Sequence, residues 1–562
     1  MRRRESWNSR IAWFLCFCLL IVLAVQTVRV HLFPDERVTG QSKSQYWAQI
    51  QISMSRGDIR DRNGVPLAIS VPSMSFYIDP AYWAPASADA LEPLFGKEAS
   101  AKFSKKLPGR FHWVARKVPM NVASQITDLK IPGLFTMRES SRMYPHGELA
   151  SHVIGFCDID GDGLSGLERE WNKVLYSPPQ NRLFVRDARG NLLDMIGSNA
   201  GALQSGGGSI QLTIDSKVQQ IVEWKLSEGV KASKAKWGAG ICVNPQTGEI
   251  LAMASYPWID LSDRKSFGDK ETLRNNVIGR VYEPGSTFKP IILGISKEMG
   301  LVSNDDHFFC SGKVTISDGV IRDVSSHGDL TLEGLLIKSC NTGMATIGHR
   351  MNPHDTSAML RQFGFGTKSD VEIAGEEDGL LQAPEKWLGV TKANVAIGQG
   401  LAVTPLQLAM AIGAIANGGE LLKPYIVSEV RNAGGEIVHH GKKRVKRVVL
   451  SSQTAAWLRG ALHATVENGT GKGARVNDIA IAGKTGTAQM AMRGKYKKGQ
   501  YDSSFIGFWP YEKPEYLLLI VLGDQGFYGG EVATPVFKAI VEDMSQLSLL
   551  AAQNDASAAI AR

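Results

Sequence analysis

The chain has 562 residues, of which 43% are hydrophobic and 21% charged, and 63 lysines and arginines against 55 aspartates and glutamates give a formal net charge of +8. This ordinary globular composition excludes a disordered, collagen-like or disulfide-stapled chain, and the length predicts about three or four domains. The basic excess is small and no recognition helix or zinc-finger spacing accompanies it, so we expect no nucleic acid partner.

The first 28 residues predict a membrane anchor behind a short cytoplasmic leader. Residues 1–10 are rich in arginine, and residues 11–28 form an apolar run just long enough to cross a bilayer as a helix. Arginines before such a run hold that end in the cytoplasm, so the rest of the chain is expected outside it. A cleaved signal peptide, with Val22-Leu23-Ala24 as its cleavage site, is the alternative. Both interpretations export the chain.

Residues 34–204 predict a β-rich pedestal domain. Short β-like runs alternate with turns there, and residues 166–175 form one helix-like stretch. The run Ser205-Gly206-Gly207-Gly208-Ser209 marks the end of this domain, because glycine and serine favour flexible connections.

Residues 209–547 predict a larger α+β domain, followed by an alanine-rich tail at 548–562. Its expected elements are helices at 215–229, 406–417 and 534–547 and strands at 238–243, 249–254, 505–509 and 516–522. Strands first and last, with helices between them, indicate that both ends of the domain meet in one sheet covered by helices. A basic cluster at 442–447 lies between two β-like runs and favours a hairpin with a solvated charged face.

The cysteines predict no metal centre. Those beyond the apolar run are Cys157, Cys242, Cys310 and Cys340. None of them forms a Cys-x-x-Cys pair, which is the spacing typical of structural zinc sites. The sequence does not decide whether two of them form a disulfide. Residues 158–163 begin like a calcium loop, but Arg169 stands at the twelfth position, where a glutamate ligand belongs.

Three short motifs in the larger domain carry the chemistry. They are Ser286-Thr287-Phe288-Lys289, Ser339-Cys340-Asn341 and Lys484-Thr485-Gly486-Thr487. Each is weak alone, since Ser233 and Lys236 have the same Ser-x-x-Lys spacing. The ordered set, with the first motif opening a helix and the last on a strand, is typical of penicillin-binding proteins and serine β-lactamases.

In the first motif, Lys289 can activate Ser286 as a nucleophile. Residues three apart lie on one face of a helix, so the amine can reach the hydroxyl. The lysine can take the proton only if burial or a nearby positive charge, such as Lys484, keeps it partly neutral. Pro284-Gly285 places Ser286 at a helix N-terminus, while Pro290 predicts strain or an irregular turn at Lys289.

The second motif offers proton transfer and substrate contact. Ser339 can relay a proton between Lys289 and a leaving amine, and Asn341 can hold a substrate amide.

The third motif predicts an edge strand that binds substrate. Gly486 lets a substrate backbone approach closely, and Thr485 can bind a substrate carboxylate. The backbone N–H groups of Ser286 and Thr487 can form an oxyanion hole.

With these motifs the chain resembles a class B penicillin-binding protein, one of the monofunctional peptidoglycan D,D-transpeptidases of bacteria. Further stretches that resemble the family are residues 56–64, 144–147 and 152–156 in the pedestal, and 247–253, 398–400, 404–405, 528–530 and 535–537 in the larger domain. The resemblance implies a transpeptidase domain with an antiparallel sheet flanked by helices. It covers nearly the whole chain after the anchor.

The resemblance also implies the reaction. Ser286 is acylated by the penultimate D-alanine of a stem peptide ending in D-Ala-D-Ala, the terminal D-alanine leaves, and the amine of a second stem peptide completes the cross-link. Lys289, Ser339, Asn341 and Lys484 assist, and Thr485, Gly486 and Thr487 bind substrate. β-Lactams are expected to acylate Ser286, and no metal or organic cofactor is implied.

Within the family, the compact pedestal and the stretch 155–175 are closer to the cell-division (septal) type than to the elongation type. That type implies a single-pass protein of the inner membrane with its catalytic domain in the periplasm. Its implied partners are a multipass lipid II glycan polymerase and other divisome membrane proteins.

Three alternatives remain. One is an elongation-type transpeptidase. Another is a β-lactamase or carboxypeptidase with the same serine machinery, against which no glutamate for a deacylating water is identifiable by motif. The last is a β-lactam sensor or scaffold, and a leader of about ten residues is too short for a cytoplasmic output domain.

Overall fold

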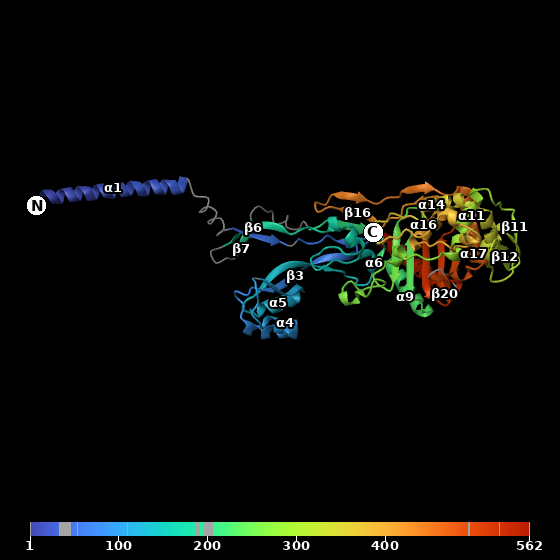
Figure 1. The fold of residues 1–562 in the computed structure, drawn as a ribbon, viewed down its shortest axis with the longest axis horizontal. Coiled ribbons are helices and arrows are strands. Elements are labelled where there is room, and N and C mark those ends of the chain that lie inside the picture. Colours follow the sequence, from blue (N-terminus) through green and yellow to red (C-terminus); the bar gives the residue numbers. More distant parts are fainter. Residues whose placement is uncertain are drawn as a thin grey trace. The chain divides into compact units, whose positions relative to one another are not determined.

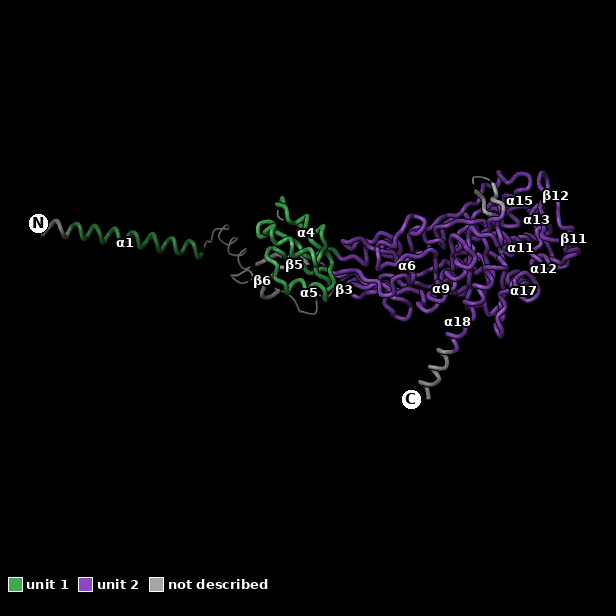
Figure 2. Tube along the Cα trace, turned by 90° about the horizontal axis from the view of Figure 1, so that it is seen from below, with its two compact units in different colours: residues 1–54, 73–139, 178–205 green, residues 55–72, 140–177, 206–562 purple. Residues whose placement is uncertain are grey.

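The computed structural model describes residues 2–32, 47–52, 54–109, 111–186, 192–195, 206–492, 495–527 and 529–560. They belong to two compact units: residues 1–54, 73–139 and 178–205 form unit 1, and residues 55–72, 140–177 and 206–562 form unit 2 (Figure 2). Parts of the predicted pedestal therefore pack with the C-terminal region. The domain bounds 34–204 and 209–547 stay predictions, and residues 34–46, 196–205 and 528 lie outside the described residues.

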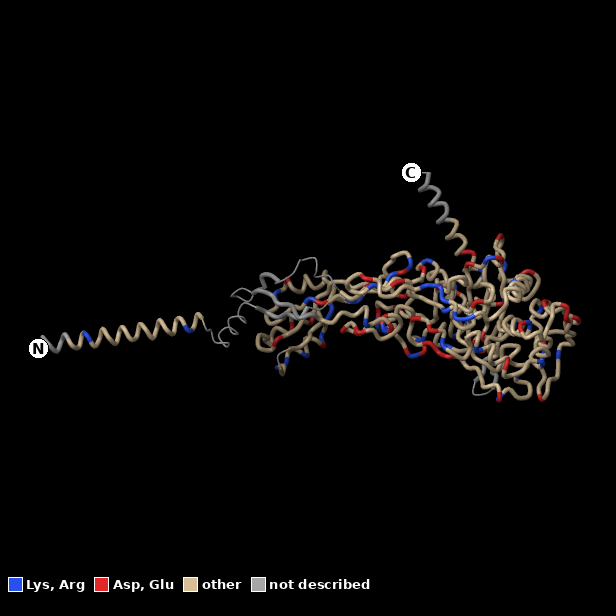
Figure 3. The backbone as a smooth tube through the Cα atoms, turned by 90° about the horizontal axis from the view of Figure 1, so that it is seen from above, with Lys and Arg blue, Asp and Glu red and all other residues tan. Residues whose placement is uncertain are grey.

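Helix α1 (Arg2–Leu32) contains the predicted anchor. Within residues 7–32 the most apolar window of 18 residues has a mean hydropathy of 2.5, and among the described residues α1 is the one helix long and apolar enough to cross a membrane. No Lys, Arg, Asp or Glu stands between Arg10 and Arg29, and the middle of α1 is accordingly tan in Figure 3. Its large apolar side chains are exposed, as expected for a helix that is surrounded by lipid in a membrane.

Unit 1 is built from two antiparallel sheets and short helices. Its elements are β1 (Trp47–Ile52), β6 (Gln180–Arg186) and β7 (Leu192–Met195) in one sheet, the end of β3 (Pro66–Ile78) with β4 (His112–Pro119) and β5 (Leu134–Met143) in the other, and η1 (Pro85–Leu91), α3 (Glu92–Phe95), α4 (Lys97–Phe103) and α5 (Met120–Asp128). Phe76 and Ile126 on one side, and Ile78 and Phe103 on the other, are buried between these strands and helices. The expectation of a β-rich region is confirmed here.

The start of unit 2 is a small sheet in the order β17 (Ile437–His440), β16 (Val427–Arg431), β8 (Ser209–Leu212), β2 (Ile59–Arg60) and β3, with helices α6 (Ser151–Ile154), α7 (Gly166–Glu170) and α8 (Asn172–Leu175). The helix expected at 166–175 is thus two short helices. The hairpin expected around residues 442–447 is wrong, because β17 pairs with β16 while β18 (Val445–Val448) pairs with β15 (Glu420–Leu422).

A buried ionic network supports this part of unit 2. The Glu168 carboxylate accepts hydrogen bonds from Arg56 Nε at 2.5 Å and from Arg142 Nε at 2.6 Å. The Glu168 side chain is fully buried, and the two arginines are 5% and 7% exposed. Because water cannot replace a lost partner there, each charge depends on the others.

A five-stranded antiparallel sheet forms the centre of unit 2. Its order is β10 (Ile250–Tyr256), β9 (Trp237–Val243), β21 (Tyr516–Gln525), β20 (Lys495–Trp509) and β19 (Ala482–Met492). Early and late strands therefore lie side by side, as Figure 1 shows with green beside red, and the predicted meeting of the two ends of the domain is confirmed. The strand β19 is at the edge.

Both faces of this sheet are covered by helices. Along β21, Leu517, Leu519 and Val521 join one core and Leu518, Ile520 and Leu522 join another, because successive side chains of a strand point to opposite faces. Helices α9 (Ser216–Ser233) and α18 (Gly529–Ile560) pack in the second core, and α11 (Lys289–Glu298) and α16 (Pro405–Ala416) in the first. Every residue of α16 is buried. Helix α18 begins earlier than the predicted helix at 534–547.

The remaining elements surround these layers. They are η3 (Arg264–Phe267), α10 (Asn276–Gly279), η4 (Gly285–Phe288), β11 (His307–Cys310), β12 (Lys313–Ile316), β13 (Gly319–Arg322), β14 (Gly328–Thr331), α12 (Leu332–Ile337), α13 (Asn341–Arg350), α14 (Pro353–Gln362), η5 (Pro384–Lys386), α15 (Thr391–Ala396), α17 (Ser452–Asn468) and η6 (Lys472–Ala474). Strand β11 pairs with β14 and β12 with β13. These four strands and α12 immediately precede the second motif, Ser339-Cys340-Asn341, in the chain.

Candidate active site

The nucleophile motif forms a tight turn at the start of a buried helix. Ser286 lies in the 3-10 turn η4, which continues directly into α11 at Lys289. The strain or irregular turn expected at Lys289 is wrong, because Lys289 has ordinary helical angles (φ −54°, ψ −41°) and proline is tolerated in a first helical turn; the 3-10 turn ends one residue earlier. Gly285 adopts φ +56°, where a side chain would be strained.

The second motif meets Lys289 directly. Lys289 Nζ donates to Ser339 O, lies 3.3 Å from Ser339 Oγ, and donates to Asn341 Oδ1 at 2.7 Å. Ser339 adopts φ +56°, and Cys340 caps the N-terminus of α13, with its Sγ accepting from Gly343 N. The structure thus brings the first two motifs together.

The third motif lies on the edge strand β19, as predicted. Lys484 Nζ lies 3.0 Å from Ser339 Oγ and 3.1 Å from Thr485 O. Thr487 Oγ1 accepts a hydrogen bond from Gly529 N at 2.9 Å. All three motifs therefore meet around one serine hydroxyl, that of Ser339.

Gly486 allows the nucleophile turn to pack against β19. A Cβ atom at Gly486 would lie 2.4 Å from Ser504 Oγ, 2.8 Å from Thr287 Cγ2 and 3.0 Å from Pro284 O. Since such distances are too short for carbon, a side chain here would displace the turn that carries Ser286. This packing gives a reason for the glycine beyond the predicted approach of substrate.

Burial sets the protonation of both lysines. Lys289 and Lys484 are fully buried. Burial lowers the pKa of Lys289 to about 8, an effect that the nearby carboxylate of Asp323 opposes. Burial, and next the charge of Lys289, holds the pKa of Lys484 well below its ordinary value. A neutral amine is therefore accessible near neutral pH, as a general base requires.

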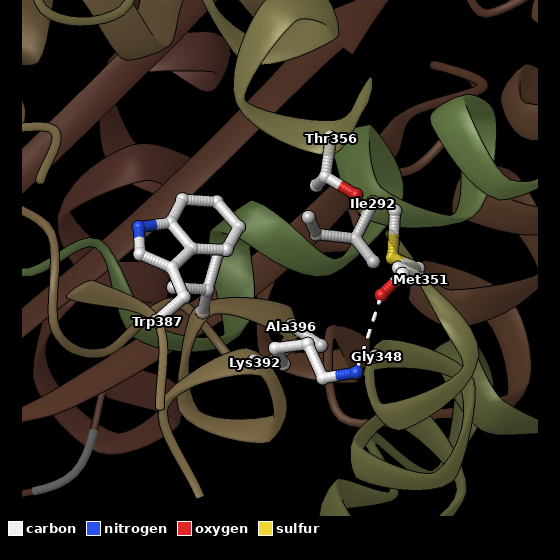
Figure 4. A pocket seen from close by; sticks show the side chains of 8 residues that line it. Ile292, Gly348, Met351, Thr356, Trp387, Lys392 and Ala396 are labelled. Atoms are coloured by element: carbon white, nitrogen blue, oxygen red, sulfur yellow. Dashed lines mark hydrogen bonds between the residues drawn. The ribbon is translucent and has the colours of Figure 1, made fainter. Parts of the chain in front are cut away.

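A cleft of about 710 Å³ opens over these groups, with Ser286, Ser339, Asn341, Thr485 and Thr487 in its wall. The volume suits a peptide-sized ligand. A separate gap beside α11, between Ile292, Met351 and Trp387, leaves no room for a ligand (Figure 4). The candidate site is therefore the cleft.

Thr470 is a site residue that the sequence did not reveal. Its Oγ1 lies 3.1 Å from Thr485 Oγ1 and 3.4 Å from Lys484 Nζ, in the cleft wall after α17. Asp323 was also missed, although it accepts hydrogen bonds from Asn341 N and Thr342 N at 2.7 and 2.9 Å. Neither stands in a recognisable motif, so only the fold brings them to the site.

Comparison with known families agrees with this geometry. Residues 238–542 match the penicillin-binding protein transpeptidase domain, and residues 51–206 match the penicillin-binding protein dimerisation domain. Among curated proteins, the peptidoglycan D,D-transpeptidase FtsI of Escherichia coli is 33% identical, with 96% of this chain and 92% of that protein covered. The stage V sporulation protein D of Bacillus subtilis is 31% identical over 95% of this chain and 85% of that protein.

Solved structures extend the similarity to the fold. Penicillin binding protein 3 of Mycobacterium tuberculosis has a TM-score of 0.68 at 27% identity, covering 89% of this chain and 97% of that one. The same protein has been solved in complexes with aztreonam and ampicillin. A peptidoglycan synthetase of Bifidobacterium adolescentis has a TM-score of 0.70 at 25% identity, with 89% and 97% of the two chains covered.

The chain therefore belongs to the class B penicillin-binding proteins, with an α+β transpeptidase domain and a β-rich dimerisation domain. Within that class it is similar to FtsI, and it is a serine-type peptidoglycan D,D-transpeptidase. One N-terminal apolar helix and these relatives indicate a membrane-anchored, single-pass protein.

Proposed function

We propose that the enzyme cross-links peptidoglycan stem peptides through an acyl-enzyme on Ser286. The observation that carries this proposal is the convergence of Lys289 Nζ and Lys484 Nζ on Ser339 Oγ, because Ser339 and Ser286 line the same cleft. This arrangement supplies a base for the nucleophile and a route for its proton.

In the acylation step, neutral Lys289 takes the Ser286 proton as Oγ attacks the penultimate D-alanine carbonyl. The backbone N–H groups of Ser286 and Thr487 stabilise the oxyanion. The proton passes through Ser339 Oγ, held by Lys484, to the nitrogen of the terminal D-alanine. The peptide bond breaks, D-alanine leaves, and an ester joins the stem peptide to Ser286.

In the second step, the amine of another stem peptide attacks this ester. The same groups act in reverse: the amine proton reaches Lys289 through Ser339, and Ser286 Oγ leaves as the hydroxyl. A new amide bond links the two peptides. Water in place of the amine would give hydrolysis, which is the outcome for the alternative carboxypeptidase.

The cleft wall offers groups for binding the donor peptide. The terminal carboxylate is placed at the Thr485 hydroxyl, beside Thr470 and Lys484 Nζ. The Asn341 side chain binds a substrate amide. Its Nδ2 also donates a hydrogen bond to Arg322 O at 2.9 Å. A β-lactam resembles the D-Ala-D-Ala end, so it acylates Ser286 and stays attached.

The cellular role that we propose is septal cell-wall synthesis. The support is the similarity to FtsI over most of the chain. On this proposal the leader is cytoplasmic, α1 crosses the inner membrane, and the catalytic unit is periplasmic. The proposed partners are a multipass lipid II glycan polymerase and other divisome membrane proteins. Depletion in living cells tests the role, since septal duty predicts filaments and elongation duty predicts rounded cells.

A peptide assay tests the reaction. The full-length protein in detergent is incubated with a pentapeptide ending in D-Ala-D-Ala and an amine acceptor, and the products are identified by mass spectrometry. The transpeptidase predicts released D-alanine together with a donor–acceptor amide, both absent in Ser286→Ala. A tetrapeptide acid without the amide would contradict cross-linking and favour the carboxypeptidase.

A further inference from the structure

Four side chains with metal-ligand chemistry converge beside the second motif. Cys310, Asp323, His327 and Cys340 place one ligand atom each within 4.8 Å of all the others. Both cysteines are buried, and the aspartate and histidine are half-buried. Two thiols, an imidazole and a carboxylate are the donor types found in tetrahedral zinc sites.

The spacing of the ligand atoms fits a tetrahedron. Cys310 Sγ lies 3.5 Å from His327 Nδ1 and 3.4 Å from Asp323 Oδ2, and Cys340 Sγ lies 3.3 Å from Asp323 Oδ2. With zinc–sulfur bonds of about 2.3 Å and zinc–nitrogen or zinc–oxygen bonds of about 2.0 Å, adjacent ligand atoms in a tetrahedron are separated by about 3.5 Å. Small adjustments of the side chains therefore suffice to enclose an ion.

The surroundings already orient the ligands. His327 Nε2 lies 3.3 Å from Ser325 Oγ, which fixes the ring from its far side. The Asp323 carboxylate accepts from the backbone N–H groups of Asn341 and Thr342. Such outer partners are typical of metal sites, where they hold each ligand in position.

The ligands come from three separate places in the chain, because Asp323 and His327 share the loop between β13 and β14. Cys310 ends β11, Asp323 follows β13, His327 precedes β14, and Cys340 caps α13. Motif spacing therefore could not reveal them, and the absence of a Cys-x-x-Cys pair carried no information about this cluster. An ion here would join two small hairpins to the helix that carries Asn341.

We propose that Cys310, Asp323, His327 and Cys340 bind one zinc ion. Four protein ligands close the coordination shell, so the site is structural and leaves no position for a reacting water. Two thiolates select zinc over magnesium or calcium. Because Cys340 lies between Ser339 and Asn341, the ion fixes the second motif relative to Lys289. The four ligands are positioning residues for the transpeptidase site.

The rival occupant of the same space is a Cys310–Cys340 disulfide, since an exported chain meets oxidising conditions. Both cysteines are free in the structure. A disulfide would also remove the thiol protons, so His327 Nδ1 and Asp323 Oδ2 would lie beside sulfur atoms that cannot donate a hydrogen bond to them. Zinc uses all four groups at once, which is why we favour it.

The test measures metal in the intact protein. Full-length protein is purified in detergent without a metal-affinity tag, dialysed against zinc-free buffer, and analysed by plasma mass spectrometry. We expect about one zinc ion per chain in the wild type and below about a tenth of that in Cys310→Ser and in His327→Gln. The matched control is Cys242→Ala, another buried cysteine that lies in β9 and should retain the zinc.

Two further readouts keep the result interpretable. Cobalt taken up in place of zinc should give thiolate-to-cobalt charge-transfer absorption in the wild type and in Cys242→Ala, and lose it in Cys310→Ser. If the cysteine variant fails to fold, the zinc content of His327→Gln and the cobalt spectrum of the wild type still show whether the cluster binds a metal ion. The proposal is overturned if the wild-type protein, with its cysteines reduced, binds neither zinc nor cobalt. It is also overturned if non-reducing peptide maps show a Cys310–Cys340 disulfide. Acylation of Ser286 is a separate measurement, so neither result touches the proposed reaction.

Discussion

Lys289 and Lys484 direct their side-chain nitrogens at the same oxygen, Ser339 Oγ, from 3.3 and 3.0 Å. Both amines are fully buried, so two positive charges at this point are strongly disfavoured. The pair therefore carries one positive charge more easily than two. A shared, mobile proton next to the nucleophile turn is what acyl transfer needs.

The first prediction concerns pH. With a pKa of about 8 for Lys289, the neutral fraction is about a tenth at about pH 7 and rises through about pH 9. The rate constant for acylation by a penicillin should rise in parallel, because only the neutral amine accepts the Ser286 proton. Stopped-flow measurement on the full-length protein checks this. Lys289→Met should abolish the reaction, while Lys297→Gln on the same helix should keep the profile. A flat profile would exclude Lys289 as the base.

The second prediction concerns Thr470, which contacts Thr485 and Lys484. Thr470→Val keeps the shape and removes the hydroxyl, so acylation should slow by roughly tenfold, the value of one or two hydrogen bonds. The matched control is Thr356→Val in α14, which loses the hydrogen bond from Thr356 Oγ1 to the backbone oxygen of Asn352. Equal rates in both variants would mean that Thr470 has no part in the site.

The third prediction concerns Gly486. A methyl group there would lie 2.8 Å from Thr287 Cγ2, so Gly486→Ala should displace the turn of Ser286 and slow acylation by at least about tenfold. Gly413→Ala in α16, where a Cβ meets no atom within 4 Å, is the control and should stabilise the fold by up to about 1 kcal/mol. Unchanged acylation in Gly486→Ala would show that the turn tolerates the shift.

The fourth prediction concerns the buried network of unit 2. Glu168→Ala leaves Arg56 and Arg142 as buried charges without their carboxylate, which should lower the free energy of unfolding by about 3–5 kcal/mol. Glu170→Ala, on the exposed side of the same helix, should change it by less than about 0.5 kcal/mol. Urea unfolding followed by fluorescence gives both values. Similar midpoints for the two variants would contradict the assigned role of Glu168.

The sequence predicted the parts of the fold that follow local rules. The apolar runs of β9, β10 and β21 identified the central strands, and Asp215 marked the start of α9, since such signals act within a few residues. Pairing was harder: β17 and β18 are neighbours in sequence but bind different strands, a choice made by distant segments.

The candidate site divides in the same way. The three motifs could be found because each is a short run with fixed spacing. Thr470, Asp323 and the Cys310–His327 pair could not, since each depends on loops that only the tertiary fold brings together. The division into two units was also hidden, because segments 55–72 and 140–177 pack with residues far along the chain.

The most direct test of Ser286 as the nucleophile is the intact mass of the full-length protein after reaction with a penicillin, measured beside that of Ser286→Ala. We predict one persistent adduct per chain on the wild type, mapped to the peptide that contains Ser286, and none on the variant. An adduct that survives in Ser286→Ala, or one that vanishes within seconds as drug is hydrolysed, would contradict a slowly deacylating transpeptidase with Ser286 as its nucleophile.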